Sequence, residues 1–361
     1  MIVRPLTEYC TLNMGQSPDS KTYNTQGKGL PFYQGNADFG ETHPITHVWC
    51  SAPVKVAEDG DILISVRAPI GAMNMAVERC CIGRGLAALT PIRNKCSKQF
   101  LYYALQSKVD SLIAQGTGST FKAISKKVLE ATCIPAYSTI EQEQIAETIG
   151  HVDNTIAARR KQLALLDQLV KSRFIELFGD PMTDVSKWSA STIGEQFNVS
   201  SGGTPATGEK AYWENGTIPW IGSNMCQDTM LSENDGKFIT EEGYAHSSAK
   251  WFHKGTVLVA LVGATIGKTA LLRFDTTTNQ NIAAIDVTQN AAFSSEFVFY
   301  HMQMLYSKFM EIGSGKFKMA NQGFIRQLPL ICPPIELQEQ FAAFVEQTDK
   351  SKLCGRTEVA A

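Results

Sequence analysis

The chain has 361 residues, 19% of them charged, and a formal net charge of −2 at pH 7. This length allows two or three domains that each bury a core, and a net charge so close to zero excludes a nucleic-acid binder that relies on a polybasic surface. No apolar run approaches the ~18 residues that a membrane-spanning helix requires, and the N-terminus lacks the pattern of a signal peptide. We therefore expect a cytoplasmic protein with no membrane partner.

The first part of the chain, residues 1–138, predicts a compact domain of mixed α/β structure. The aliphatic run Asp61–Val66 is typical of a strand, and Ser97–Ala114 is typical of short helices. Polar loops that contain glycine separate these elements. Basic residues slightly outnumber acidic ones in this segment, so contacts with nucleic acid would depend on local patches.

A long helix follows, over residues 139–179. Ser138 or Thr139 can act as its N-cap, with acidic side chains in the first turn, and Gly179 followed by Pro181 marks its end. Apolar residues recur within it at alternating steps of four and three, which is the spacing of a coiled-coil seam. Because one apolar seam needs a partner, we assign an interface to Ile145, Ile149, Val152, Ile156, Leu163, Leu166 and Val170.

Residues 180–332 predict a second domain of the same kind. It has a strand at Thr256–Val262 and short helices at Ser294–Ile312. Here acidic residues slightly outnumber basic ones. Composition alone therefore favours an ordinary solvated surface over a strongly charged one.

A second helix is predicted within residues 333–361. Phe341 and Val345 occupy its first seam positions, and we assign them to the same interface. The apolar repeat is lost after Val345, so the spacing predicts a helix that ends near Lys352, about half as long as the first. Antiparallel pairing would then leave Leu163–Val170 as an exposed apolar stripe, through which a second copy or another subunit could associate.

Five stretches of sequence occur twice, in the same order and about half a chain apart. This period is far too long for a solenoid repeat, so the sequence indicates two copies of one domain, each followed by the start of a helix. The pairs are "GQSP" from Gly15 and "GGTP" from Gly202, "LPFYQGN" ending at Asn36 and "IPWIGSN" ending at Asn224, "GDILISVRAPIG" from Gly60 and "GTVLVALVGATIG" from Gly255, "GTGSTFKAIS" ending at Ser125 and "GSGKFKMANQ" ending at Gln322, and "EQEQIAETI" from Glu141 and "LQEQFAAFV" from Leu337.

Catalytic motifs are weak. The run "GATIGKT", Gly263–Thr269, resembles a phosphate-binding loop but has three residues instead of four between its first glycine and the Gly-Lys pair. We interpret it as a tight turn between strands, although Lys268 could still reach a DNA phosphate. There is no HExxH or GxSxG motif, the six histidines have no metal-ligand spacing, and the nine cysteines contain no CxxC pair and are expected to be reduced. The balance favours binding over catalysis.

Polar and aromatic side chains recur in matched loops of the two copies. Asn, Gln and Arg can read base edges, while Lys, Ser and backbone amides near glycines hold phosphates. One such loop alone is more often a solvated turn, but recurrence in both copies makes a shared function more credible. The predicted DNA-binding residues are Gln16, Ser17, Lys21, Tyr23, Gln34, Asn36, Arg67, Lys122, Thr204, Lys210, Tyr212, Trp213, Ser223, Asn224, Lys268, Gln280, Asn281, Lys316, Lys318 and Gln322.

The order of these stretches, and their duplication around a long helix, resemble the specificity subunits of Type I restriction-modification systems over nearly the whole chain. The resemblance implies an α+β fold with two duplicated mixed α/β target-recognition domains separated by long antiparallel coiled-coil helices. Each domain would bind one half of a bipartite double-stranded DNA target. The resemblance also implies modification (methyltransferase) and restriction subunits as partners. These would bring S-adenosylmethionine, ATP and magnesium, with no cofactor bound by this chain.

The short second helix departs from the family pattern, in which the two helices are about equally long. It suggests a truncation, and it puts in doubt a full-length intramolecular coiled coil and one of the surfaces for modification subunits. Two other function classes stay open. One is a non-catalytic scaffold built from duplicated domains. The other is a stand-alone DNA methyltransferase or nuclease, which the missing motifs disfavour.

Overall fold

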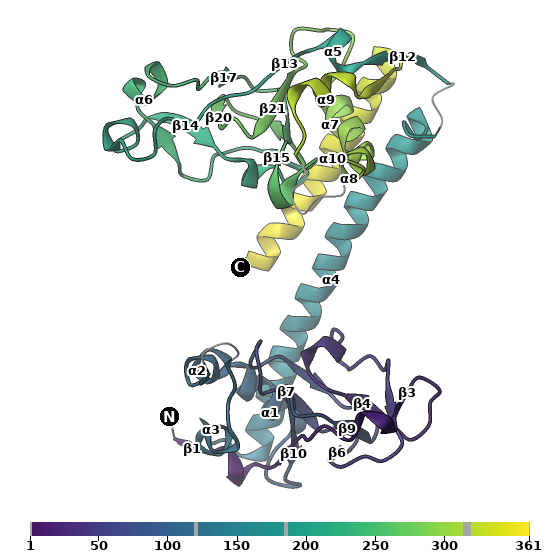
Figure 1. Ribbon diagram of the computed structural model, residues 1–361, viewed down its shortest axis with the longest axis vertical. Helices are drawn as coiled ribbons and strands as arrows, with labels where there is room; N and C mark the ends of the chain where they lie inside the picture. Colours follow the sequence, from purple (N-terminus) through teal and green to yellow (C-terminus); the bar gives the residue numbers. More distant parts are fainter. Residues whose placement is uncertain (1, 119–121, 184–186, 313–318, 361) are drawn as a thin grey trace. The chain divides into compact units, whose positions relative to one another are not determined.

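The computed structural model describes residues 2–118, 122–183, 187–312 and 319–360. It divides into two compact units, Met1–Ala157 and Ala158–Ala361, which we call the first and second domains (Figure 1). The division falls inside the longest helix, α4 (Thr139–Phe178), whose first turns pack on the first domain and whose last turns pack on the second. Within the described residues, no helix combines the length and the apolarity that crossing a membrane requires.

The first domain is built on two sheets. The central sheet, in the order β2-β10-β7-β8, is antiparallel throughout. In the outer sheet, ordered β3-β5-β4-β9-β6, strands β4 and β9 run parallel. The central strands are β2 (Cys10–Met14), β10 (Leu86–Pro91), β7 (Ile62–Ser65) and β8 (Met73–Met75), and the outer ones are β3 (Tyr23–Asn24), β5 (Trp49–Cys50), β4 (Leu30–Tyr33), β9 (Cys80–Ile82) and β6 (Val56–Ala57).

Alternation along β7 explains why the central sheet is covered on both faces. Successive side chains of a strand point to opposite faces, and Ile62 and Ile64 belong to a core with the helices, whereas Leu63 belongs to a second core with the outer sheet. The helices on this domain are α1 (Lys98–Gln106), α2 (Val109–Ala114) and α3 (Lys126–Ala131), and a small sheet pairs β1 (Val3–Pro5) with β11 (Cys133–Pro135). The predicted strand at Asp61–Val66 is confirmed, and the predicted helical segment Ser97–Ala114 divides into α1 and α2.

The second domain repeats this plan. Its central sheet has the order β13-β21-β18-β19-β15, and its outer sheet, ordered β16-β14-β20-β17, again has a parallel pair, β14 with β20. The central strands are β13 (Asn198–Ser200), β21 (Ile282–Asp286), β18 (Val257–Ala260), β19 (Thr269–Leu272) and β15 (Thr229–Leu231), the outer strands are β16 (Phe238–Ile239), β14 (Ile218–Ile221), β20 (Thr276–Thr278) and β17 (Trp251–Phe252), and β12 (Ser189–Thr192) pairs with β22 (Pro329–Cys332).

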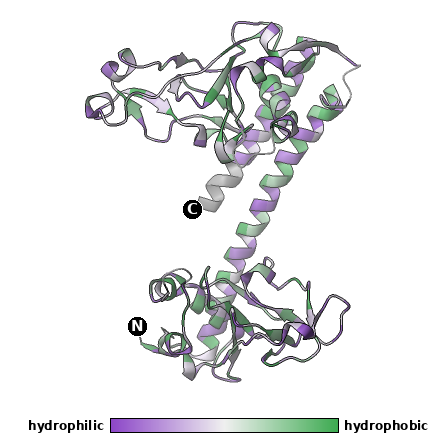
Figure 2. Ribbon diagram, in the orientation of Figure 1, coloured by the Kyte–Doolittle hydropathy of each residue, from purple (hydrophilic) through white to green (hydrophobic). Residues whose placement is uncertain are grey.

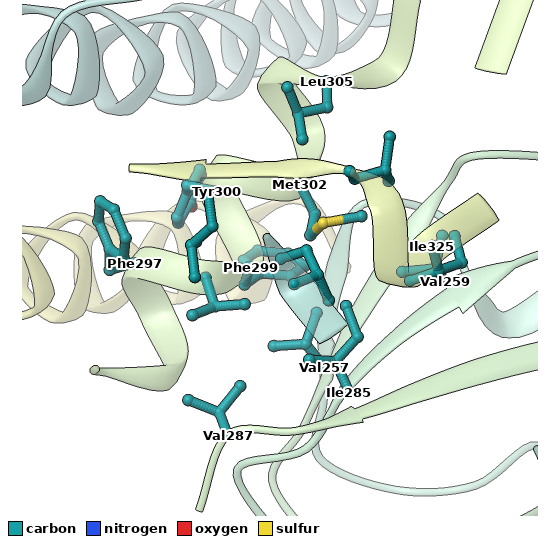
Figure 3. Close-up of a cluster of buried hydrophobic side chains, with 14 of the residues drawn as sticks. Val257, Val259, Ile285, Val287, Phe297, Phe299, Tyr300, Met302, Leu305 and Ile325 are labelled. Atoms are coloured by element: carbon teal, nitrogen blue, oxygen red, sulfur yellow. The ribbon is translucent and has the colours of Figure 1, made fainter. Parts of the chain in front are cut away.

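The helical side of this domain holds its largest core. Val257 and Val259 of β18 pack there with Phe297 and Met302, as Figure 3 shows. Their neighbour Leu258 faces the outer sheet instead. The helices are α5 (Ile193–Gln196), α6 (Glu241–Ala245), α7 (Ser295–Met304), α8 (Tyr306–Met310), α9 (Gln322–Gln327) and α10 (Ile335–Ala360).

The ends of α4 follow the expected capping chemistry. Ser138 is the N-cap, and its backbone N–H and hydroxyl both donate to the Glu141 carboxylate, at 2.8 and 2.7 Å. Gly179 takes a φ of +81°, the left-handed conformation that ends a helix without a Cβ clash. Between these ends, hydrophilic and hydrophobic residues alternate along the helix (Figure 2). The long helix is therefore confirmed with boundaries within a residue of those expected.

Helix α10 lies antiparallel to the last turns of α4. Near its start, the Phe341 ring contacts those of Phe174 and Phe178, with centroids 5.4 and 5.6 Å apart. Further along, Lys352 reaches back to Asp167. The expectation that this helix ends near Lys352 is wrong, because α10 runs to Ala360. A helix already nucleated by packed turns propagates at little cost, even through a glycine.

Burial divides the predicted seam into three groups. Val170 is fully buried with Phe341 and Val345 in the largest core of the second domain, so it cannot belong to an exposed stripe. By contrast, Ile149 and Val152 are 36% and 53% exposed. The partly buried members of the seam are Ile145, Ile156, Leu163 and Leu166.

The packing of α10 explains why Val170 is buried. Phe341 and Val345 enter the core of the second domain, and α10 brings them onto Val170. The large apolar residues that α4 leaves exposed in this domain are Leu165, Leu169 and Ile175, at 54%, 49% and 46%, all outside the predicted seam. Val170, Phe341 and Val345 therefore contribute to the core of the second domain.

Candidate nucleic-acid interface

In the first domain, polar loops meet around the connection between β9 and β10, residues 83–85. The Gly83 N–H donates to the Tyr33 carbonyl at 2.8 Å, and the Gly85 N–H donates to the Gln34 carbonyl at 3.1 Å. These bonds fix the connection against the end of β4. Strands β4 and β9 pair with each other, and these bonds extend the pairing into the loops that follow them. The residues after β4 are therefore held beside residues 83–85.

Further backbone bonds attach the other loops to the same connection. The Val66 N–H donates to the Gly85 carbonyl and the Ile124 N–H to the Val66 carbonyl, both at 2.9 Å. On the other side, the Arg84 N–H donates to the Ser17 hydroxyl at 3.3 Å. We call the group of segments held this way the first loop cluster; its segments are 15–18, 34–36, 66–69, 83–85 and 122–124.

The second domain builds the same frame from different residues. The Asn279 N–H donates to the Ile221 carbonyl at 3.1 Å, the Leu261 N–H to the Asn281 carbonyl at 2.9 Å, and the Ala320 N–H to the Leu261 carbonyl at 2.8 Å. Each bond has its counterpart in the first domain. The second loop cluster accordingly comprises residues 201–205, 222–224, 261–265, 279–281 and 320–322.

Two glycines allow this close approach. A Cβ on Gly15 would lie 2.1 Å from the Gly83 carbonyl oxygen, and a Cβ on Gly202 would lie 2.1 Å from the Thr278 carbonyl oxygen. No side chain tolerates such a contact, so the "GQSP" and "GGTP" loops can cross the β9–β10 and β20–β21 connections only with glycine at these positions. The sequence motif thus has a structural cause.

Most of the predicted DNA-binding residues fall in the two clusters. Thr204 donates its hydroxyl to the Gln280 side-chain oxygen at 2.6 Å, and the Thr265 hydroxyl donates to the Ser223 carbonyl at 3.2 Å. These contacts bring together loops that lie up to 76 residues apart in the chain. The predicted residues so collected are Gln16, Ser17, Gln34, Asn36, Arg67 and Lys122 in the first domain, and Thr204, Ser223, Asn224, Gln280, Asn281 and Gln322 in the second.

The predicted aromatic residues pack within their domains. Tyr23 stacks on Phe32 with centroids 4.7 Å apart, and its hydroxyl donates to the Pro18 carbonyl at 3.0 Å. Trp213 packs edge to face on Trp220 at 5.2 Å. Tyr23 and Trp213 are each partly buried against their own domain, and their contact with DNA stays a prediction.

Three other predicted residues, Tyr212, Lys210 and Lys21, lie in the loops near β3 and β14. Tyr212 stacks on His246 with centroids 6.2 Å apart, and the exposed Lys210 pairs with Glu214 at 3.5 Å. Lys21 is exposed in the turn before β3. Lys316 and Lys318 lie outside the described residues.

Lys268 has a structural partner. Its ammonium lies 2.6 Å from an Asp228 carboxylate oxygen and 4.9 Å from the centre of the Tyr306 ring. The same carboxylate accepts bonds from the backbone and hydroxyl of Thr269. The charge of Lys268 is thus paired within the domain while 35% of its side chain is exposed, and its contact with a DNA phosphate stays a prediction.

The interpretation of "GATIGKT" as a turn is confirmed. Residues Gly263–Thr265 form a short 3-10 helix between β18 and β19. Gly263 and Gly267 both take positive φ angles, +75° and +77°. Such a turn gives glycines a conformational role and leaves no ring of backbone amides around a phosphate.

Arg84 is a candidate that the sequence reasoning missed. It is exposed, it has no ion-pair partner within the part of the chain that the structure describes, and it lies at the centre of the first cluster. Its equivalent in the second domain is Gln280. The signal was available in the sequence, because "GRGLAAL" from Gly83 aligns with "NQNIAAI" from Asn279.

The two clusters differ in charge. The first presents the exposed cations Arg67, Arg84 and Lys122, whereas the second presents mainly amides and hydroxyls. The carboxylate of Asp38, next to the first cluster, is occupied by the backbone N–H groups of Gln34 and Gly35, at 2.6 and 3.3 Å. Exposed cations, amides and hydroxyls on a glycine-rich frame are chemically suited to bind phosphates and base edges.

Comparison with known proteins connects this arrangement to one family. The family model described as Type I restriction modification DNA specificity domain matches residues 1–168 and again residues 185–356. The putative type I restriction enzyme MjaX specificity subunit of Methanocaldococcus jannaschii is 41% identical over 164 residues, which are 45% of this chain and 39% of that protein. The MjaIX specificity subunit of the same organism is 24% identical over 75% of this chain and 69% of that protein. The chain thus spans well under half of the first of these relatives.

Solved structures agree in fold over the whole chain. The type I restriction-modification system S subunit from M. genitalium superposes with a TM-score of 0.62, covering 99% of this chain and 92% of that one at 18% identity. A chain from a structure described as the basis of complex assembly and conformational transition of the type I R-M system superposes with a TM-score of 0.57, at 17% identity and with 99% and 93% coverage. At these identities the likeness establishes the fold.

Proposed function

Because the chain belongs to the Type I restriction modification DNA specificity domain family, we propose that it binds double-stranded DNA sequence-specifically, each domain reading one half of a bipartite target. One observation supports this above the others. The same hydrogen-bond frame occurs in both domains and carries different exposed side chains in each, Arg84 in one and Gln280 in the other. A constant frame with variable side chains is what two readers of different half-sites require.

The test is selection of bound duplexes from a random-sequence library by the full-length chain, alone and with its modification subunit. Enrichment of a two-part sequence with a fixed spacer is expected. Binding should weaken steeply with salt, because phosphate contacts release counterions. A bound pool with the same composition as the input would contradict the proposal.

We further propose that the chain is non-catalytic and works in the cytoplasm with modification and restriction subunits. In this proposal S-adenosylmethionine, ATP and magnesium enter with those partners. Two observations support it: the ammonium of Lys268 in the phosphate-loop-like turn is bound to Asp228, and no group of three metal-ligating side chains occurs among the described residues. ATP turnover that is lost in Lys268→Ala would contradict it.

The exposed part of the α4 seam is the proposed docking point for the modification subunit. Ile149 and Val152 lie one turn apart, with 36% and 53% of their surfaces exposed, and covering the exposed part of such side chains contributes roughly 0.5–1.5 kcal/mol each. We expect Val152→Glu to abolish co-purification with the modification subunit, while Gln144→Glu on the same helix does not. If Val152→Glu instead disperses an oligomer of the chain and leaves subunit binding intact, the stripe serves self-association.

A further inference from the structure

The two clusters have one central position in common. In the first domain, residue 84 lies between Gly83, whose N–H binds the Tyr33 carbonyl, and Gly85, whose carbonyl accepts from the Val66 N–H. In the second, residue 280 lies between Asn279, whose N–H binds the Ile221 carbonyl, and Asn281, whose carbonyl accepts from Leu261. The backbone of the middle residue is thus fixed on both sides by equivalent bonds.

The residues around this position are exchanged in a complementary way. In the first domain Gln34 is large and the connection is small: a Cβ on Gly83 would lie 3.0 Å from the Gln34 Cα, and one on Gly85 would lie 2.4 Å from the Gln34 carbonyl oxygen. In the second domain the position of Gln34 is Gly222, and Asn279 takes the place of Gly83. The larger side chain therefore lies in the loop after β4 in the first domain and in the β20–β21 connection in the second, while the backbone hydrogen bonds are the same.

The middle side chains are held differently. The backbone N–H of Arg84 donates to the Ser17 hydroxyl, and Arg84 is exposed. The side-chain oxygen of Gln280 accepts from the Thr204 hydroxyl at 2.6 Å, which fixes the plane of the amide. Within the described residues the Gln280 amide has no other side-chain hydrogen bond, so one lone pair of that oxygen and both amide hydrogens stay available. Ser17 and Thr204 come from the matched "GQSP" and "GGTP" loops and act as positioning residues.

We infer that Arg84 and Gln280 are the equivalent specificity-determining residues of the two domains, Arg84 reading a guanine and Gln280 an adenine through the major-groove edge. The guanidinium offers two parallel donors to guanine O6 and N7, and the amide offers a donor to N7 and an acceptor to the N6 amino group of adenine. This inference rests on the proposed function, because it names the bases that each domain recognises.

The test is reciprocal exchange in the full-length chain with its modification subunit, followed by selection from randomised duplexes. Arg84→Gln should change the preference at one position of one half-site from guanine toward adenine, by roughly ten- to a hundredfold, and leave the other half-site unchanged. Gln280→Arg should do the converse in the other half. Arg84→Lys, which keeps the charge and loses the planar pair of donors, should lower discrimination at that position.

A matched control is Arg79→Gln, because Arg79 is an exposed arginine of the same domain that pairs with Glu58 at 3.3 Å, outside the cluster. It should leave the base profile unaltered. If Arg84→Gln weakens every sequence equally and reduces the salt dependence by one phosphate contact, Arg84 binds the backbone and the inference is overturned. An unchanged profile also overturns it. Absence of any preference in the wild-type protein would instead show that the proposed function itself fails.

Discussion

Asp167 of α4 and Lys352 of α10 form an ion pair, with 2.8 Å between the carboxylate oxygen and the ammonium nitrogen. The Lys352 side chain is only 12% exposed and also lies 3.0 Å from Asp349. Burial alone would lower the pKa of this lysine, but hydrogen bonds with the two carboxylates raise it. The pair therefore fastens the α10 turns beyond Val345, where the apolar seam has already ended.

Replacing this lysine should loosen the second domain. We expect Lys352→Ala to lower the free energy of unfolding by about 1 kcal/mol, because two carboxylates lose their partner while Asp167 stays largely hydrated. Lys350→Ala, which breaks an exposed pair with Glu346 on the same helix, should leave the free energy of unfolding nearly unchanged, because water screens this pair. Urea unfolding of both variants measures the two free energies, and equal effects would argue against a stabilising role for the Asp167–Lys352 pair.

His301 should make the second domain sensitive to mild acid. Its Nε2 lies 2.9 Å from the Pro329 carbonyl, its Nδ1 is buried with no partner among the described residues, and burial lowers its pKa from 6.5 to about 4. The unfolded chain binds the proton first, so this contribution to stability is complete above pH 6.5 and is lost as the pH falls toward 4. We expect a loss of about 2 kcal/mol at pH 5.

Urea unfolding at pH 7.5 and pH 5 measures this contribution. His301→Gln should be less stable at pH 7.5 but should lose about 2 kcal/mol less than the wild type on acidification. His151→Gln is the comparison variant, because it removes an exposed histidine of α4 instead of a buried one. An unaltered pH dependence in His301→Gln would refute the assignment.

The two glycines of the β18–β19 turn should respond differently to alanine. Both take a positive φ, which costs about 1–2 kcal/mol for a residue with a Cβ. A Cβ on Gly267 would also lie 2.7 Å from the Phe309 ring, whereas one on Gly263 meets open space. We expect thermal or urea unfolding to show a loss of about 3 kcal/mol for Gly267→Ala and about 1 kcal/mol for Gly263→Ala. Similar losses would mean that Phe309 moves aside freely.

Two lysines should separate phosphate contact from structural pairing. Lys122 is exposed in the first cluster, and its carbonyl accepts from the Ala68 N–H at 3.1 Å, so we expect Lys122→Ala to reduce the slope of log affinity against log salt by about one. Lys268→Ala should leave that slope unchanged and lower stability, because Asp228 loses its partner. Measurements of DNA affinity at several salt concentrations give the slope for each variant. A reduced slope for Lys268→Ala would show that Lys268 contacts a phosphate.

Local patterns in the sequence were sufficient for the long elements. The four-three spacing and the caps at Ser138 and Gly179 predicted α4, and the aliphatic runs predicted β7 and β18. The matched glycines Gly15 and Gly202 also identified the "GQSP" and "GGTP" loops, each of which belongs to the loop cluster of its own domain. These features depend on residues close in sequence or on exact repetition, both of which can be read without coordinates.

Features that depend on distant partners could not be read in this way. The bond between Lys268 and Asp228 joins residues 40 positions apart, and the burial of Val170 requires the fold to bring Phe341 beside it. The repeat aligns Arg84 with Gln280, but that Arg84 lies among the polar loops of the first cluster follows from hydrogen bonds with residues such as Tyr33 and Ser17, which are distant in sequence. The length of α10 was underestimated because an apolar seam measures helix packing and says little about how far a packed helix propagates.

The claim that each domain reads its own half of a bipartite DNA target is tested most directly by exchanging one domain. Residues 1–138 would be replaced by the corresponding segment of a related specificity subunit with a different target, and bound duplexes would be selected with the modification subunit present. We expect one half of the selected sequence to change to that of the donor and the other half to stay as it was. A change in both halves, or in neither, would contradict it.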